Sequence, residues 1–231
     1  MFQGFPQSGF KFLKELRLNN NREWFTKHKS EYEKHIKFPA IEIIEEMHDI
    51  FTKNNIPFLA HPKKSLFRIY RDTRFSNDKT PYKTHVGITF TFHSDEIDNS
   101  IATKTEKPGM YIHLEPNNCF IAGGLYAPDS TQLRNIRVAL DTDWKLLEQL
   151  SKQKKLLQEF PAGLTGEQLK TMPRGFSVEH PGKELLRMKQ FLLFENVPQK
   201  MVQSPSIISV IENKAKAMAP IMEFLSLAMI D

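Results

Sequence analysis

The chain has 231 residues, 40% of them hydrophobic, and a net charge of +5, so it can bury a sizeable core and is expected to form one domain spanning residues 1–231. It has no apolar run of about 18 residues and no signal-peptide pattern at its start, which predicts a soluble cytoplasmic protein with no membrane partner. Cys119 is the single cysteine, which excludes an internal disulfide and a zinc site built from several cysteines.

The first 53 residues are predicted to form a helical layer. Ser8 is expected to cap a helix that ends near residue 18, and Asn21 to cap a second helix that runs to about residue 37. Pro39 is expected to restart the chain as a third helix, which reaches about residue 53 and presents an apolar stripe for burial.

The apolar period then changes from that of helices to that of strands. Residues 66–72 alternate apolar and polar side chains, and residues 84–92 show the strongest alternation in the chain. Residues 110–114 follow the same two-residue period, and a turn at 116–118 leads into a further strand at 119–125, so these four segments are predicted to form a meander of short antiparallel strands. The polar segment 94–108 is expected to be a mobile loop between two of the strands.

The C-terminal part returns to helices. Asp129 and Gln132 have the spacing of a capping box, and the helix behind them is expected to reach about residue 140. The remaining predicted elements are a helix capped by Thr142, a charged helix at 152–160, a short helix at 181–188, a strand at 191–194 and a terminal helix that Pro220 kinks or divides. This order favours an α+β fold, an antiparallel meander sheet flanked by an N-terminal helical layer and C-terminal helices.

Positive charge is concentrated in residues 63–83. This segment contains two carboxylates, Asp72 and Asp78, and seven cationic side chains, so it accounts for the whole net charge of +5. The seven are Lys63, Lys64, Arg68, Arg71, Arg74, Lys79 and Lys83. An excess confined to so short a segment is more typical of a local pocket than of the long basic stripe that binds extended nucleic acid.

Residues 71–83 read RDTRFSNDKTPYK, and this run resembles the signature of the family called domain of unknown function 2461. Flanking pieces at 20–25, 111–116 with 122–126, and 173–176 with 180–181 resemble the same family, so the resemblance spans nearly the whole chain. It implies no particular reaction, and function is therefore inferred from the residues themselves. The piece at 20–25 is explained mostly by helix punctuation and by aromatic side chains that fill the core.

The cations of the central segment form the first candidate site, because arginine suits bidentate contact with phosphate or carboxylate. The residues expected to converge on one anion are Arg68, Arg71, Arg74, Lys79 and Lys83. Asp72 and Asp78 are expected to neutralise two of these charges in the ligand-free protein. The alternative is a structural network, in which Asp72 pairs with Arg71 or Arg74 and pins the loop.

Asp72 and Asp78 are also the candidate catalytic residues, as a general base or as metal ligands. Cations on both sides are expected to lower their pKa values, which suits an ionised, electrostatic role better than proton donation. Capping or salt bridging is the alternative role for both carboxylates.

His85, His113 and Glu115 form a second constellation. His113 and Glu115 share one strand face, and His85 lies on the polar side of a strand that is expected to be adjacent. Because the chain lacks a closely spaced histidine pair, hydrogen-bonded polar residues on an open sheet face are favoured over a metal centre, and no metal site is predicted. His113 is kept as a candidate ligand-binding residue, and the cofactor is left open.

Tyrosines and one further arginine complete the candidates. Tyr70, Tyr82, Tyr111 and Tyr126 lie near the same strands, where they can finish a polar pocket or stack a base, although strand propensity and packing explain them more simply. Arg174 lies in an irregular stretch that either closes over the sheet as a lid or forms a tight turn.

Three functions follow from these residues. The first is a basic pocket that binds a phosphate-bearing or other anionic small molecule, as a binding protein or as an enzyme. The second is a noncatalytic module that binds nucleic acid or an acidic protein through the same basic face. In the third, the charged segment only holds the fold together.

Overall fold

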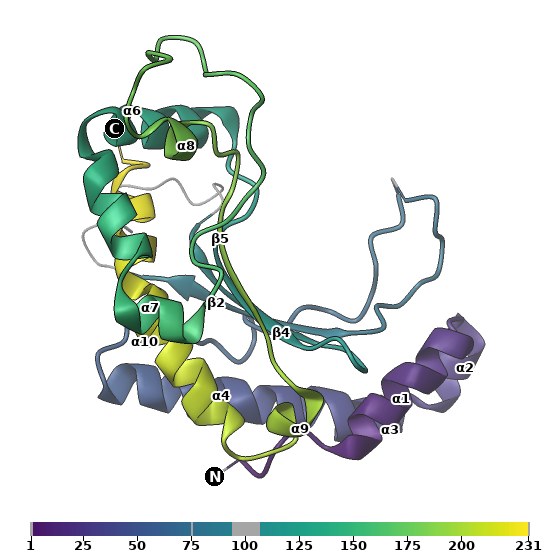
Figure 1. Cartoon of the computed structure of the whole chain (residues 1–231). Helices are drawn as coiled ribbons and strands as arrows, with labels where there is room; N and C mark the ends of the chain where they lie inside the picture. The colour runs from purple at the N-terminus through teal and green to yellow at the C-terminus, as the bar shows by residue number, and fades with distance from the viewer. Residues whose placement is uncertain (1, 75, 94–106, 231) are drawn as a thin grey trace.

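The computed structural model describes residues 2–74, 76–93 and 107–230, which build a five-stranded antiparallel sheet in the order β1-β2-β3-β4-β5 (Figure 1). The strands are β1 (Phe58–Leu59), β2 (Val86–Phe92), β3 (Gly109–Leu114), β4 (Phe120–Leu125) and β5 (Phe191–Asn196). Each strand pairs with the next along the chain, which confirms the predicted meander and the α+β fold. Residues 94–106 of the predicted mobile loop lie outside the described residues.

The two faces of the sheet differ in character. The face that carries Ile88 and its cross-strand partner Ile112 is buried. Helices α4 (Phe38–Lys53) and α10 (Ile207–Leu227) pack against the strands, and in Figure 1 α4 lies below the sheet while α10 rises from below it along the left side. Because strand residues alternate in direction, neighbours such as His113 point to the opposite face, where the candidate side chains of the sheet lie.

The N-terminal layer consists of α1 (Gln7–Leu18), α2 (Arg22–Lys27), α3 (Lys29–Tyr32), the π-helical turn η1 (Glu33–Lys37) and α4. Asn21 caps α2 as predicted, because its side chain accepts a hydrogen bond from the backbone of Trp24 at 2.9 Å. Ser8 does not cap α1, which begins at Gln7, and its hydroxyl instead bonds His35 Nδ1 at 2.9 Å. Pro39 does not restart the chain, because η1 runs directly into α4 and the first turn of a helix tolerates proline.

The C-terminal helices are α6 (Ser130–Ser151), α7 (Lys154–Glu159), α8 (Lys183–Leu186), α9 (Gln199–Val202) and α10. The capping box of Asp129 and Gln132 is present. The predicted break is present as a kink at Asp143, where two helical stretches meet within α6, but the Thr142 hydroxyl donates to the Ala139 carbonyl oxygen at 3.1 Å and is not seen to cap the second stretch. Pro220 lies inside α10 and does not divide it. None of the described helices combines the length and the apolar character that crossing a bilayer requires.

The prediction of a strand at 66–72 is wrong. These residues belong to an extension on the right of Figure 1, which we call the basic arm and define as residues 66–74 and 76–83. Isolated bridges join Leu66 to Ile88 and Tyr70 to Tyr82. The two limbs of the arm also bond each other, since the Arg71 N–H donates to the carbonyl oxygen of Pro81 at 2.9 Å. Proline has no N–H to donate in return, so the limbs do not form a regular ladder.

Candidate functional site

The basic arm is fastened to the N-terminal helices by Asn20 and Phe25. The Asn20 side chain donates to the Tyr82 carbonyl oxygen at 2.9 Å and accepts from the Tyr82 N–H at 3.1 Å, as a neighbouring strand would. The buried Tyr82 ring stacks on Phe25, with centroids 4.0 Å apart. These contacts hold the arm beside α2 and create a hollow between them.

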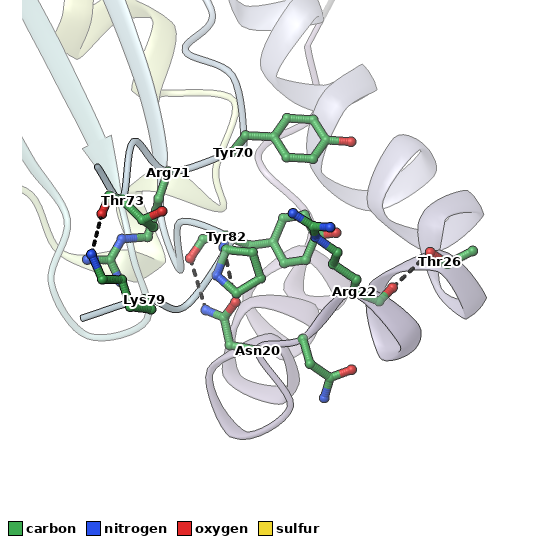
Figure 2. Close-up of a pocket in the computed structure, with 10 residues that line it drawn as sticks. Asn20, Arg22, Thr26, Tyr70, Arg71, Thr73, Lys79 and Tyr82 are labelled. Atoms are coloured by element: carbon green, nitrogen blue, oxygen red, sulfur yellow. Dashed lines mark hydrogen bonds between the residues drawn. The ribbon is translucent and has the colours of Figure 1, made fainter. Parts of the chain in front are cut away.

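This helix-side hollow has a volume of about 590 Å³. Figure 2 shows Lys79 and Thr73 of the arm at one side of it and Arg22 and Thr26 of α2 at the other, with Tyr82 between them. The lining residues are Asn20, Asn21, Arg22, Thr26, Tyr70, Arg71, Thr73, Lys79, Pro81 and Tyr82. Among the described residues, the lining therefore contains three cationic side chains and no carboxylate.

A second, sheet-side hollow of about 390 Å³ lies next to the first and shares Asn20, Arg71 and Tyr82 with it. Its further lining residues are Arg17, Asp78, Thr80, Lys83, Thr84 and His85. Arg71 is thus common to both hollows, and the second hollow leads from the arm toward the open face of the sheet.

Arg71 forms an ion pair with Asp78, and the same guanidinium donates to the Thr80 hydroxyl. Asp78 also accepts a hydrogen bond from the Thr80 N–H at 2.9 Å, which shapes the turn of the arm. The hydrogen bond from Arg71, followed by those from Thr80, lowers the pKa of Asp78 to about 2. Asp78 is therefore ionised at neutral pH and cannot act as a proton donor there.

Arg74 forms a separate ion pair outside both hollows. Its guanidinium donates to Asp72 through Nε at 3.0 Å and Nη2 at 2.7 Å, and these bonds lower the pKa of Asp72 to about 2. Arg68, which is exposed, also lines neither hollow. Of the predicted cations, the structure brings together Arg71, Lys79 and Lys83 and places Arg68 and Arg74 apart from them.

On the open face of the sheet, Glu115 joins the N-terminal helices to His113. Glu115 forms an ion pair with Arg17 and lies 3.2 Å from Nε2 of His113, whose Nδ1 lies 3.1 Å from the Tyr111 hydroxyl. Burial raises the pKa of Glu115, but hydrogen bonds from Asn118 and His113 outweigh it and the pKa is lowered overall. An ionised carboxylate only accepts hydrogen bonds, so Nε2 of His113 donates to Glu115, and Nδ1 is left for the contact with the Tyr111 hydroxyl.

His85 does meet His113, but by ring stacking. The two ring centroids lie 4.4 Å apart, and both nitrogens of His113 are already engaged by Tyr111 and Glu115. Burial, and next the neighbouring His113, lower the pKa of His85 to about 4. In the part of the chain that the structure describes, no cluster of three or more His, Cys, Asp or Glu residues has the geometry of a metal site.

Arg174 lies far along the chain from this site and lines neither hollow. It is exposed, in the segment between α7 and α8. That segment is fastened to α6, because His180 Nε2 lies 3.1 Å from the Asp141 carbonyl oxygen and its ring packs edge-on against Trp144.

Sequence reasoning missed Arg17, Asn20 and Arg22 as site residues. Residues 20–25 were interpreted as helix punctuation, and Asn21 does cap α2, yet Asn20, Asn21 and Arg22 all line the helix-side hollow. The sequence signal for Asn20 and Arg22 was that residues 20–25 resemble the same family as residues 71–83 do. Phe120 and Phe194, which extend the ring stacking from His113 across β4 and β5, carried no such signal.

The comparison with protein families agrees with that resemblance. The family model described as "Conserved hypothetical protein (DUF2461)" matches residues 8–224, which include the basic arm and both hollows. No curated protein and no solved structure matches the chain. Because the family model covers nearly the full length, the chain belongs to the DUF2461 family of conserved hypothetical proteins.

Proposed function

We propose that the chain binds a phosphate-bearing or other anionic small molecule in the two adjoining hollows, with Arg71 as the residue that both hollows share. The observation that carries the proposal is the charge of the helix-side hollow. Among the described residues, Arg22, Arg71 and Lys79 line it and no carboxylate does. A partly enclosed group of like charges is stabilised when an anion binds between them.

The geometry of the lining supports the same proposal. Arginine presents a planar fork that matches the oxygens of phosphate or carboxylate, and Arg22 and Arg71 approach the hollow from two different elements. The hydroxyls of Thr26 and Thr73 and the amide of Asn20 add neutral hydrogen-bonding groups. Volumes of about 590 and 390 Å³ fall within the roughly 300–1,000 Å³ range of small-molecule sites.

The two carboxylates of the arm have different places in this proposal. Asp78 lines the sheet-side hollow and holds Arg71, so it acts as the counter-ion that an incoming anion displaces. Asp72 holds Arg74 away from both hollows. Both have pKa values of about 2, which favours an electrostatic role over acid catalysis.

Calorimetric titration with pyrophosphate and with ribose 5-phosphate tests the proposal. Wild-type protein is expected to bind at one saturable site, and Arg71→Gln is expected to weaken binding at least tenfold, because a hydrogen bond to a charged group contributes roughly 1.5–3 kcal/mol. Arg74→Gln is the matched control, since Arg74 is in the same arm, also pairs with an aspartate and lines neither hollow. Equal losses in both variants contradict the proposal.

The alternative of a nucleic-acid or acidic-protein surface makes a different prediction. A polyanion held by spread charge binds with an affinity that falls steeply with salt and depends on every exposed cation of the arm. In that case Arg68→Gln and Arg74→Gln weaken binding of single-stranded DNA or polyglutamate as much as Arg71→Gln does.

A further inference from the structure

An aromatic ladder crosses the open face of the sheet and ends in the sheet-side hollow. We define it by its four rings, His85, His113, Phe120 and Phe194, whose successive centroids lie 4.4, 4.6 and 4.9 Å apart. His113 and Phe120 are direct cross-strand partners, and their planes are only 7° from parallel. The rings therefore stack across the spacing between strands instead of lying flat on the sheet.

This stacking determines where a further ring can bind. His113 stacks on His85 and on Phe120, so both of its faces are occupied, and the next contact, of Phe120 with Phe194, is tilted by 38°. Only the outer faces of the two end rings remain for a ligand. His85 is the end that lines the sheet-side hollow.

The ladder is held rigidly at His113. Its Nδ1 lies 3.1 Å from the Tyr111 hydroxyl, and its Nε2 donates to Glu115, which is itself held by Arg17 and by the Asn118 amide at 2.9 Å. Fixing the ring of His113 on both sides limits the rotation of His85, which stacks on it. A preorganised ring loses less freedom when a ligand stacks on it, so more of the contact energy appears as affinity.

The cations of the site surround the His85 end. Arg71 and Lys83 line the same hollow as His85, and the ammonium of Lys83 lies 5.1 Å from the centroid of the Phe67 ring. Because its pKa is lowered to about 4, His85 is a neutral, flat ring at neutral pH and does not add to the positive charge. The hollow thus places the aromatic ring of His85 beside guanidinium and ammonium groups.

We infer that the anionic ligand of this site also carries a planar ring, which stacks on the outer face of His85 while its phosphate lies at Arg71. Nucleotides are the ligand class that combines these two groups. This inference rests on the proposed function and adds to it the chemical class of the ligand. The expected ligand is a mononucleotide, because the ladder has a single end ring in this hollow. A surface that binds single-stranded nucleic acid presents several rings, on which successive bases stack.

The test compares adenosine monophosphate with ribose 5-phosphate, which has the same phosphate and sugar but no base. The nucleotide is expected to bind wild-type protein about tenfold more tightly, the lower part of the range for stacking one base on an aromatic side chain. His85→Ala is expected to abolish this preference, so that the ratio of the two affinities falls to about one. His85→Phe keeps a ring and is expected to keep the preference, which separates stacking from a general effect on folding.

Each outcome decides between the two proposals. Equal affinities for both ligands in wild-type protein, or a preference that survives His85→Ala, overturn the inference and leave anion binding intact. Absence of binding by both ligands overturns anion binding and this inference together. An affinity for oligoadenylates that rises steadily with strand length overturns the single stacking position in favour of an extended nucleic-acid surface.

Discussion

Replacing Asp78 with asparagine is expected to tighten anion binding, because the aspartate occupies the guanidinium that the anion needs. Arg71 is held by the Asp78 carboxylate through Oδ2, while Oδ1 accepts the Thr80 N–H at 2.9 Å. Asparagine keeps an oxygen for the Thr80 bond and the same side-chain shape, so the turn of the arm is preserved. The substitution therefore removes the charge of Asp78 and leaves its local structural role in place.

The size of the effect follows from the exposure of the pair. The side chains of Arg71 and Asp78 are 26% and 56% exposed, so water screens their attraction strongly. Opposite unit charges about 4 Å apart in water attract each other with an energy that changes an equilibrium constant roughly fivefold. Salt reduces this further, so a two- to fivefold lower Kd is expected at low ionic strength and a smaller change at high ionic strength.

Calorimetry with pyrophosphate at about 20 mM and about 500 mM salt measures this change. Asp72→Asn is the control, because it alters the net charge equally but removes the ion pair with Arg74, which lines neither hollow. The reasoning is refuted if Asp78→Asn binds no more tightly than Asp72→Asn. Weaker binding by Asp78→Asn alone shows that the carboxylate takes part in holding the ligand.

Three further predictions concern the fold around the site. Lys214→Met is expected to destabilise the protein by about 1–3 kcal/mol, because the buried ammonium donates to the carbonyl oxygen of Glu159 at the end of α7. Lys216 is exposed, and Lys216→Met is expected to change the stability by about 0.5 kcal/mol or less. Asn20→Ala is expected to cost about 2 kcal/mol and to weaken anion binding, because two hydrogen bonds to the arm are lost, whereas Asn19→Ala leaves binding unchanged. His85 has a pKa of about 4 in the folded chain against 6.5 when unfolded, so the unfolded chain binds more protons as the pH falls. The free energy of unfolding is therefore expected to drop by about 1 kcal/mol from pH 6.5 to about pH 4, relative to His85→Phe.

Urea denaturation measures the three changes in the free energy of unfolding. Equal losses for Lys214→Met and Lys216→Met show that burial of the first ammonium contributes nothing. Unchanged stability of Asn20→Ala shows that other contacts hold the arm. A constant difference between wild-type protein and His85→Phe from pH 7 to about pH 4 contradicts a lowered pKa for His85, since the carboxylates titrate alike in both proteins.

The sheet could be predicted because burial of one face imposes a two-residue period on the sequence. Residues in β2 and β3 follow that period, and the apolar side chains that alternate along them are the buried ones, whereas β4 also carries Phe120 and Ala122 on its half-buried face. Residues 66–72 have the same alternation but pair with a limb that contains Pro81, so no ladder forms. The identity of the pairing partner is not visible in the alternation itself, which explains the error.

The site could be predicted only where its residues are neighbours in the sequence. Dense charge in one segment identified Arg71, Lys79 and Lys83, which do line the hollows. Arg22 comes from α2, which reaches the arm because Asn20 bonds the backbone of a residue 62 positions later in the chain. Such a contact depends on tertiary packing, and neither local charge nor period reports it.

The same contacts bear on whether the charged arm only holds the fold together. A structural role for the charges requires buried pairs, but the side chains of Arg74 and Asp72 are 77% and 45% exposed, and pairs of that kind contribute little to stability. The arm is instead fixed by neutral groups, the Asn20 amide on the backbone of Tyr82 and the Tyr82 ring on Phe25. Because these bonds fasten the arm to the helices through neutral groups, the proposed ligand gives the concentration of positive charge a role that the fold does not require. An Arg71→Gln variant that keeps the wild-type free energy of unfolding but loses anion binding separates the two roles, and a variant that unfolds restores the structural one.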